Sequence, residues 1–137
     1  MRLDTRKNIG NAGLAMAIAY FGSNGYTVSI PLNDTQDYDL VVDMDGVLKK
    51  VQVKSTNSLT RDGAYALPLK STSGTTRKQY KTVKDTDVDL LFCLCGGRLM
   101  FLIPVSEIRN TSVLSLREEA SKYSCAKTDY TRYRVYM

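Results

Sequence analysis

Residues 38–56 constrain the fold more than any other part of the chain, because they predict two β-strands joined by a tight turn. Asp45 and Gly46 give the strongest hairpin signal, since both positions of a two-residue loop need a positive φ, which Gly and Asp tolerate best. With these residues in the loop, Asp39 lies opposite Gln52. Side chains alternate between faces along a strand, so this register divides the hairpin into an apolar face and a polar face.

The polar face gathers acids, an amide and amines at the open end of the hairpin. Directly opposed Cβ atoms of antiparallel strands lie about 5 Å apart, so Asp39 converges with Gln52, and Asp37 with Lys54. Alternation alone also fits an ordinary half-exposed hairpin whose ion pairs cross the two strands. The polar face holds Asp37, Asp39, Asp43, Lys50, Gln52 and Lys54, and the apolar face holds Leu40, Val42, Met44, Val47, Val51 and Val53, with Lys49 interrupting it near the turn.

Length and charge limit the class of protein. At 137 residues the chain predicts one domain over residues 1–137, whose core needs no metal or disulfide staple. The net charge of +5 without any histidine favours a polyanionic partner such as nucleic acid. Three cysteines, no histidine and no CxxC motif argue against a zinc site and for a reducing compartment.

The compartment follows from what the chain lacks. No apolar run approaches the roughly 20 residues that cross a bilayer. The N-terminus also lacks the apolar core of a signal peptide. We therefore expect a cytoplasmic protein.

Periodicity predicts the elements around the hairpin. Residues 8–22 are almost wholly apolar and predict a buried helix that covers one face of a sheet, with Asp4 or Thr5 as its N-cap. Four further strands are predicted at residues 25–31, 63–70, 87–95 and 98–104, the second of them as a third antiparallel neighbour of the hairpin.

Two short helices are expected near the C-terminus, over residues 106–109 and 116–122. Ser115 is the expected N-cap of the second one, because Glu118 follows three residues later and completes a capping box.

Two basic segments are candidates for phosphate contacts. Residues 71–84 hold four cations, no acid and many hydroxyls, the groups that make most phosphate contacts; the alternative is a solvated loop that leads into a short helix. Residues 122–137 interleave cations with tyrosines, which can stack on bases or pack inward on a terminal strand. The candidate DNA-binding residues are Arg77, Lys78, Tyr80, Lys81, Lys84, Arg132 and Arg134.

The spacing from Asp39 to the triplet Gln52, Val53 and Lys54 resembles the PD-(D/E)XK endonuclease pattern, in which an Asp begins one strand and an acidic-x-Lys triplet lies on the next. The order of a buried helix, "GYTVSIPL", "YDLVVD", "VQVKST", "VDLLF" and "FLIPV" is similar to that of the compact phage and bacterial members. It most resembles the group I intron homing endonuclease branch, which also has Gln-x-Lys. Archaeal Holliday-junction resolvases share the core more distantly.

The resemblance implies an α/β fold with a restriction-endonuclease-like αβββαβ core, in which helices flank a mixed central sheet. It also implies Mg²⁺-dependent hydrolysis of DNA phosphodiester bonds, with Mn²⁺ as a substitute, by a homodimer or homotetramer. By position, Asp39 becomes the central metal ligand, while the Gln52 side chain and the Val53 main-chain carbonyl are further ligands. Lys54 would orient or activate the attacking water and offset charge on the phosphate.

Two positions depart from the family pattern. Gln52 is neutral, and the first helix lacks the usual glutamate, for which Asn11 is the nearest match and Asp37 an alternative second carboxylate. A weak or inactive DNA-binding module on the same scaffold is therefore one alternative function, and a Holliday-junction resolvase-like enzyme is another. A basic structural or inhibitory protein is the third.

Overall fold

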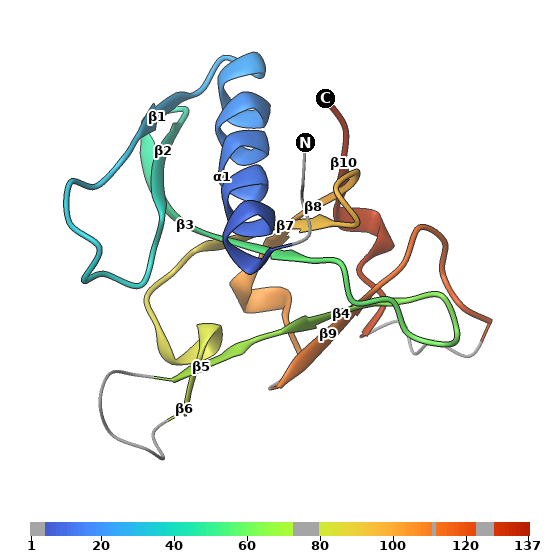
Figure 1. The fold of residues 1–137 in the computed structure, drawn as a ribbon. Helices are drawn as coiled ribbons and strands as arrows, with labels where there is room; N and C mark the ends of the chain where they lie inside the picture. Colours follow the sequence, from blue (N-terminus) through green and yellow to red (C-terminus); the bar gives the residue numbers. More distant parts are fainter. Residues whose placement is uncertain (1–4, 73–79, 111, 123–127) are drawn as a thin grey trace.

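Figure 1 shows a central six-stranded sheet with one long helix, α1 (Arg6–Ser23), across one of its faces. The computed structural model describes residues 5–72, 80–110, 112–122 and 128–137. The strands of the central sheet follow the order β1-β2-β3-β7-β8-β10. They are β1 (Thr27–Ser29), β2 (Leu40–Met44), β3 (Val47–Thr56), β7 (Leu90–Cys95), β8 (Leu99–Pro104) and β10 (Arg134–Val135).

The hairpin of β2 and β3 has the predicted register. Leu40 pairs with Val51, and the two loop residues Asp45 and Gly46 have φ values of 56° and 89°. The pairs β1 and β2, β7 and β8, and β8 and β10 are antiparallel. β3 and β7 run parallel. The expectation of a mixed sheet is therefore confirmed.

Helix α1 packs closely on the sheet. Its N-cap is Thr5, whose side chain accepts a hydrogen bond from a main-chain N–H of the first turn at 3.2 Å. Gly13, Ala17 and Phe21 recur every four residues and are buried. A Cβ on residue 13 would lie 2.0 Å from Oγ of Ser55 on β3, so the glycine permits this close approach. The core under α1 holds Leu40, Val42, Val51, Phe92, Leu94 and Met100.

Two small sheets cover the opposite face of the central sheet: β4 (Tyr65–Pro68) with β9 (Val113–Leu116), and β5 (Lys70–Thr72) with β6 (Tyr80–Thr82). A second core lies between them and the central sheet. Because β7 contributes to both cores, its sequence is apolar on both faces. The second core includes Leu67, Leu69, Leu91, Cys93, Cys95, Phe101, Ile103, Leu114, Leu116 and Tyr130.

Several elements differ from the expectation. In the described part of the chain between β4 and β7, β5, β6 and the 3₁₀ turn η1 (Val83–Asp85) stand where a helix was expected. The strand expected over residues 63–70 pairs with β9 instead of joining the hairpin. Near the C-terminus, the helix expected over residues 106–109 is a short 3₁₀ turn, η2 (Val105–Glu107). The helix expected over residues 116–122 is wrong, because Ser115 and Leu116 lie within β9 and no helix follows them up to residue 122. A separate 3₁₀ turn, η4 (Thr131–Tyr133), precedes β10.

Among the residues that the structure describes, none of the helices has the length and apolar character needed to span a bilayer.

Candidate active site on strand β3

Asp39 lies where β2 begins, and it is bound to β3 twice. Its main-chain N–H donates to the carbonyl oxygen of Val51 at 2.8 Å. Its side-chain Oδ2 accepts a hydrogen bond from the main-chain N–H of Val53 at 2.7 Å. The second bond fixes the carboxylate just before the start of β2, beside the part of β3 that pairs with β7 but extends past β2. It also leaves the other carboxylate oxygen, Oδ1, for another partner.

The open edge of β3 exposes a main-chain carbonyl beside this carboxylate. The carbonyls of Lys50 and Thr56 accept hydrogen bonds from the β7 side, from Asp89 N and Gly96 N at 2.9 Å each. Main-chain groups alternate in direction along a strand, so the carbonyl of Val53 points to the opposite edge, toward Asp39. The ligand role that the family resemblance implied for Val53 stays a prediction.

Gln52 and Lys54 project from the face of β3 that is turned away from α1. Their β7 partners are Leu91 and Cys93, both members of the second core. Asp39 has the same orientation, because its neighbour Leu40 points into the core under α1. The structure therefore places Asp39, Gln52 and Lys54 on one face, as the hairpin register predicted.

Desolvation shifts the pKa values of both charged groups, although Asp39 remains exposed and Lys54 is half-buried. Desolvation raises the pKa of Asp39 above its ordinary value, although the hydrogen bond from Val53 and the charge of Lys54 act in the other direction. Desolvation likewise lowers the pKa of Lys54, against the opposing influence of Cys93 and Asp39. A carboxylate and an ammonium that are both shifted toward neutrality, on one open face, are typical of functional sites.

The donor set suits a hard cation. A carboxylate oxygen of Asp39, the amide oxygen of Gln52 and the carbonyl of Val53 are all oxygen ligands, which Mg²⁺ prefers while it keeps several waters. Within the described ranges, no group of three or more acidic or cysteine side chains is placed to hold a metal ion. Asp39 is thus the one formal negative charge in this donor set.

Asn11, the expected replacement for the helix glutamate, is not brought to this cluster. It is exposed on α1 together with Ala15 and Ala19, and α1 covers the other face of the sheet. Asp37 is half-buried in the loop before β2.

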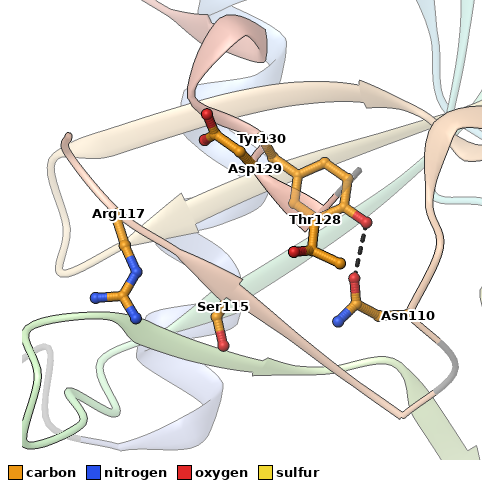
Figure 2. A pocket seen from close by; sticks show the side chains of 6 residues that line it. All are labelled: Asn110, Ser115, Arg117, Thr128, Asp129 and Tyr130. Carbon is orange, nitrogen blue, oxygen red and sulfur yellow. Dashed lines mark hydrogen bonds between the residues drawn. The ribbon is translucent and has the colours of Figure 1, made fainter. Parts of the chain in front are cut away.

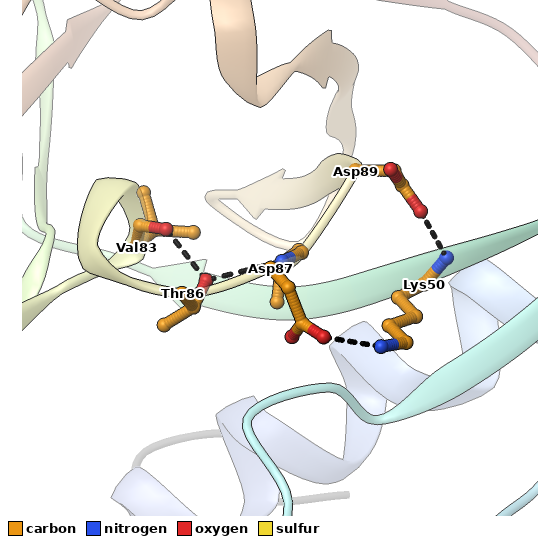
Figure 3. A network of polar contacts seen from close by, with 6 residues as sticks. Lys50, Val83, Thr86, Asp87 and Asp89 are labelled. Atoms are coloured by element: carbon orange, nitrogen blue, oxygen red, sulfur yellow. Dashed lines mark hydrogen bonds and ion pairs between the residues drawn. The ribbon is translucent and has the colours of Figure 1, made fainter.

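A polar network that the sequence patterns did not reveal surrounds Lys50, two residues before Gln52 on β3 (Figure 3). The side chain of Lys50 forms an ion pair with Asp87. Asp89 brackets the Lys50 main chain, because its Oδ2 accepts from Lys50 N at 2.9 Å and its own N–H donates to Lys50 O at 2.9 Å. Thr86 braces this segment by donating to the Val83 carbonyl at 2.6 Å. The alternation of Lys50, Gln52 and Lys54 along β3 was the sequence signal that could have identified Lys50 as a functional residue.

The predicted DNA-binding residues have different surroundings. Arg77 and Lys78 lie outside the described residues, and Tyr80 and Lys81 belong to β6. Lys84 is exposed on η1. Arg132 is exposed and lies 4.6 Å from the Tyr133 ring, whereas Arg134 forms an ion pair with Glu118 at 3.6 Å.

The C-terminal segment is anchored through the protein interior. A polar pocket of about 240 Å³ lies beside this segment. In it, the buried Tyr130 donates its hydroxyl proton to Asn110 Oδ1 at 2.7 Å (Figure 2). The same hydroxyl accepts a hydrogen bond from Arg109 N at 3.0 Å. These contacts, together with β10, favour the terminal-strand interpretation of this segment.

A second cavity, of about 410 Å³, lies at the end of β3 just beyond Lys54. It was not foreseen, because its lining comes from three segments that are distant in sequence. The lining residues are Arg6, Ile9, Ser55, Thr56, Asn57, Ser58 and Pro68.

Comparison with known proteins supports a nuclease fold. Residues 4–133 match the family described as PD-(D/E)XK endonuclease. Protein 5.3 of Escherichia phage T7 is 35% identical over 86 residues, which is 62% of this chain and 70% of that protein. The structure is similar to that of the bacterial homing endonuclease I-Ssp6803I, with a TM-score of 0.71 and 27% identity, over 95% of this chain and 87% of that one. The expected fold class and family resemblance are therefore confirmed.

Proposed function

The chain belongs to the PD-(D/E)XK endonuclease family, and we propose that it is a metal-dependent DNA endonuclease with its active site at Asp39, Gln52, Val53 and Lys54. The observation that carries this proposal is the hydrogen bond that the Val53 N–H donates to Asp39 Oδ2 at 2.7 Å. It holds a carboxylate beside β3, whose Gln52 and Lys54 side chains share one face.

In this proposal, Mg²⁺ is the natural ion and Mn²⁺ can replace it. Asp39 and the oxygens of Gln52 and Val53 would hold the ion, which supplies polarisation of the phosphate and a bound water of lowered pKa. With a single carboxylate in the site, we expect weaker metal binding than two acids would give.

Lys54 acts at the phosphate. Its ammonium lies on the same face as Asp39, and partial desolvation strengthens its interaction with an anion. A fixed cation at this position stabilises the negative charge that develops on the phosphate in the transition state. Because desolvation lowers the pKa of Lys54, its proton is also released more readily to a group that it orients.

The basic residues of segment 71–84 and Arg132 supply phosphate contacts in this proposal. The likeness to a bacterial homing endonuclease favours sequence-directed cutting of duplex DNA by a homodimer or homotetramer in the cytoplasm. The alternative is a role in phage recombination or repair, with a DNA junction among the substrates. The assay below distinguishes the two, because it compares duplex and junction DNA.

A DNA-binding module without hydrolytic activity is the second candidate function. The observation that favours it is the donor set, in which Asp39 is the one carboxylate and Gln52 takes the place of an acid. This candidate predicts DNA binding that weakens with salt but no strand cleavage.

The test is a cleavage assay on supercoiled plasmid, linear duplex and a four-way junction, each with Mg²⁺, Mn²⁺ or EDTA. Lys54→Ala is compared with Lys49→Ala, because Lys49 is the lysine of β3 on the opposite face, paired with Val42. We expect metal-dependent cleavage that Lys54→Ala removes and Lys49→Ala retains. Binding without cleavage under every metal condition would favour the second candidate.

A further inference from the structure

Lys50 shares the face of β3 that carries the proposed active site, and it precedes Gln52 by two residues and Lys54 by four. Same-face residues of a strand are successive neighbours about 7 Å apart. The three side chains therefore form a row along β3, with an ammonium at each end and the carboxamide between them.

Several contacts hold the Lys50 ammonium in place. It pairs with Asp87 and lies 5.5 Å from the centre of the ring of Tyr38, the residue directly before Asp39. Asp89 fixes the main chain of Lys50 on both its N–H and C=O sides, at 2.9 Å each. The position of this cation relative to Asp39 is thus set by the main chain and by an aromatic ring.

The ion pair itself is open to solvent. The side chains of Lys50 and Asp87 are 38% and 69% exposed. Exposed ion pairs contribute little to stability, so an incoming phosphate can replace the Asp87 carboxylate.

We infer that Lys50 is a DNA-phosphate-binding residue adjacent to the cleavage site. In the free protein the Asp87 carboxylate pairs with the Lys50 ammonium, and a DNA phosphate replaces this carboxylate on binding. The inference rests on the proposed function, which identifies the partner as DNA. Lys50 contacts the backbone next to the reacting phosphate and positions the strand, and Asp87 lowers the affinity of the surface for DNA.

The experiment measures duplex binding by fluorescence anisotropy at several salt concentrations in EDTA, where cleavage does not interfere. The variants are Lys50→Ala, Lys50→Gln, Asp87→Asn and the double variant Lys50→Ala/Asp87→Asn, with Lys49→Ala as the matched control on the other face of β3. Thermal melting of each variant reports folding, and Lys50→Gln keeps most of the stem in case Lys50→Ala unfolds.

We expect Lys50→Ala and Lys50→Gln to weaken binding several-fold and to reduce the slope of log affinity against log salt by about 0.9, the value for one phosphate contact. Lys49→Ala should change neither quantity. Asp87→Asn should strengthen binding several-fold in the wild-type background, and this gain should disappear in the Lys50→Ala background.

An unchanged affinity and salt slope in both Lys50 variants would overturn the inference, as would an equal effect of Lys49→Ala. An equal gain from Asp87→Asn with and without Lys50 would overturn the part assigned to Asp87. These outcomes are distinct from failure of the proposed function, which shows as absent cleavage while binding still depends on Lys50. A wild-type protein that does not bind DNA would overturn both proposals.

Discussion

The carboxylate of Asp39 and the main-chain N–H of Val53 are joined by a hydrogen bond of 2.7 Å, just before the first residue of β2. The bond gives an edge N–H of β3 the hydrogen-bond acceptor that a neighbouring strand provides elsewhere in the sheet. It also ties the position of the proposed metal ligand to the same residue whose carbonyl faces it. Changes at Asp39 should therefore affect both the chemistry and the local strand edge.

Substitutions at Asp39 separate these two effects. Asp39→Asn keeps an oxygen that can accept from Val53, so its free energy of unfolding should stay within about 1 kcal/mol of wild type. Asp39→Ala leaves the N–H without its partner and should cost about 1–3 kcal/mol. Chemical denaturation of both variants checks this order, and equal stabilities would show that the hydrogen bond contributes nothing.

The pKa shifts predict the pH dependence of cleavage. Asp39 must be ionised to hold a cation, so the acid limb of the profile should lie above the ordinary aspartate value, because burial raises this pKa. If Lys54 acts as a cation, the alkaline limb should fall below the ordinary lysine value. Single-turnover rates across pH test both limbs. Lys54→Arg, which stays charged, should move the alkaline limb upward, and an unmoved limb would assign it to another group.

The same lysine should reduce stability at neutral pH. The folded-state pKa of Lys54 is depressed, so folding opposes its charged form at any pH below the folded pKa. Stability rises as the pH increases from the folded pKa to the unfolded one. Lys54→Met should therefore raise the free energy of unfolding at pH 7, and its advantage should shrink as the pH approaches the ordinary lysine value. Urea titrations at neutral and alkaline pH measure this difference, and a less stable Lys54→Met at pH 7 would contradict it.

The hairpin register was within reach of the sequence because its signals are local. Asp45 and Gly46 fix the loop, and the alternation of the flanking strands fixes the faces, so Leu40 opposite Val51 followed directly. The Asp89 bracket around Lys50 was out of reach, because it joins residues 39 positions apart and no local pattern signals it.

The helix wrongly predicted near the C-terminus had a clear local signal, but non-local packing overrode it. Ser115 and Glu118 were predicted to form a capping box. Instead, Ser115 lies in β9 and pairs with Ala66 of β4, and Glu118 forms ion pairs with Arg98 and Arg134. Leu114 and Leu116 alternate into the second core, so tertiary packing overrode the local helix signal. The strand over residues 63–70 was given the wrong neighbour for the same reason, since β4 pairs with β9, which is distant in sequence.

Two glycines of α1 should respond oppositely to alanine. A methyl group added at Gly10 would meet no atom within 4 Å, so Gly10→Ala should stabilise the protein by about 0.5–1 kcal/mol through helix propensity. Gly13→Ala would crowd Ser55 Oγ at 2.0 Å and Val53 Cγ1 at 3.3 Å, which should destabilise by about 1–3 kcal/mol. Chemical denaturation measures both changes.

A second-site change provides the control for Gly13. Ser55→Ala removes the hydroxyl that the new methyl group meets, so the Gly13→Ala/Ser55→Ala double variant should recover most of the lost stability. A double variant as unstable as Gly13→Ala would place the strain elsewhere.

The most direct measurement compares cleavage of supercoiled plasmid by Asp39→Asn and Asp43→Asn with Mg²⁺. Both aspartates are on the same face of the hairpin, but Asp43 accepts a hydrogen bond from Gly46 N at 2.8 Å at the turn, away from Gln52 and Lys54. We expect Asp39→Asn to lower the single-turnover rate by about 100-fold or more and Asp43→Asn to cut like wild type. Wild-type cleavage by Asp39→Asn, in a folded protein, would contradict the assignment of the active site to this cluster.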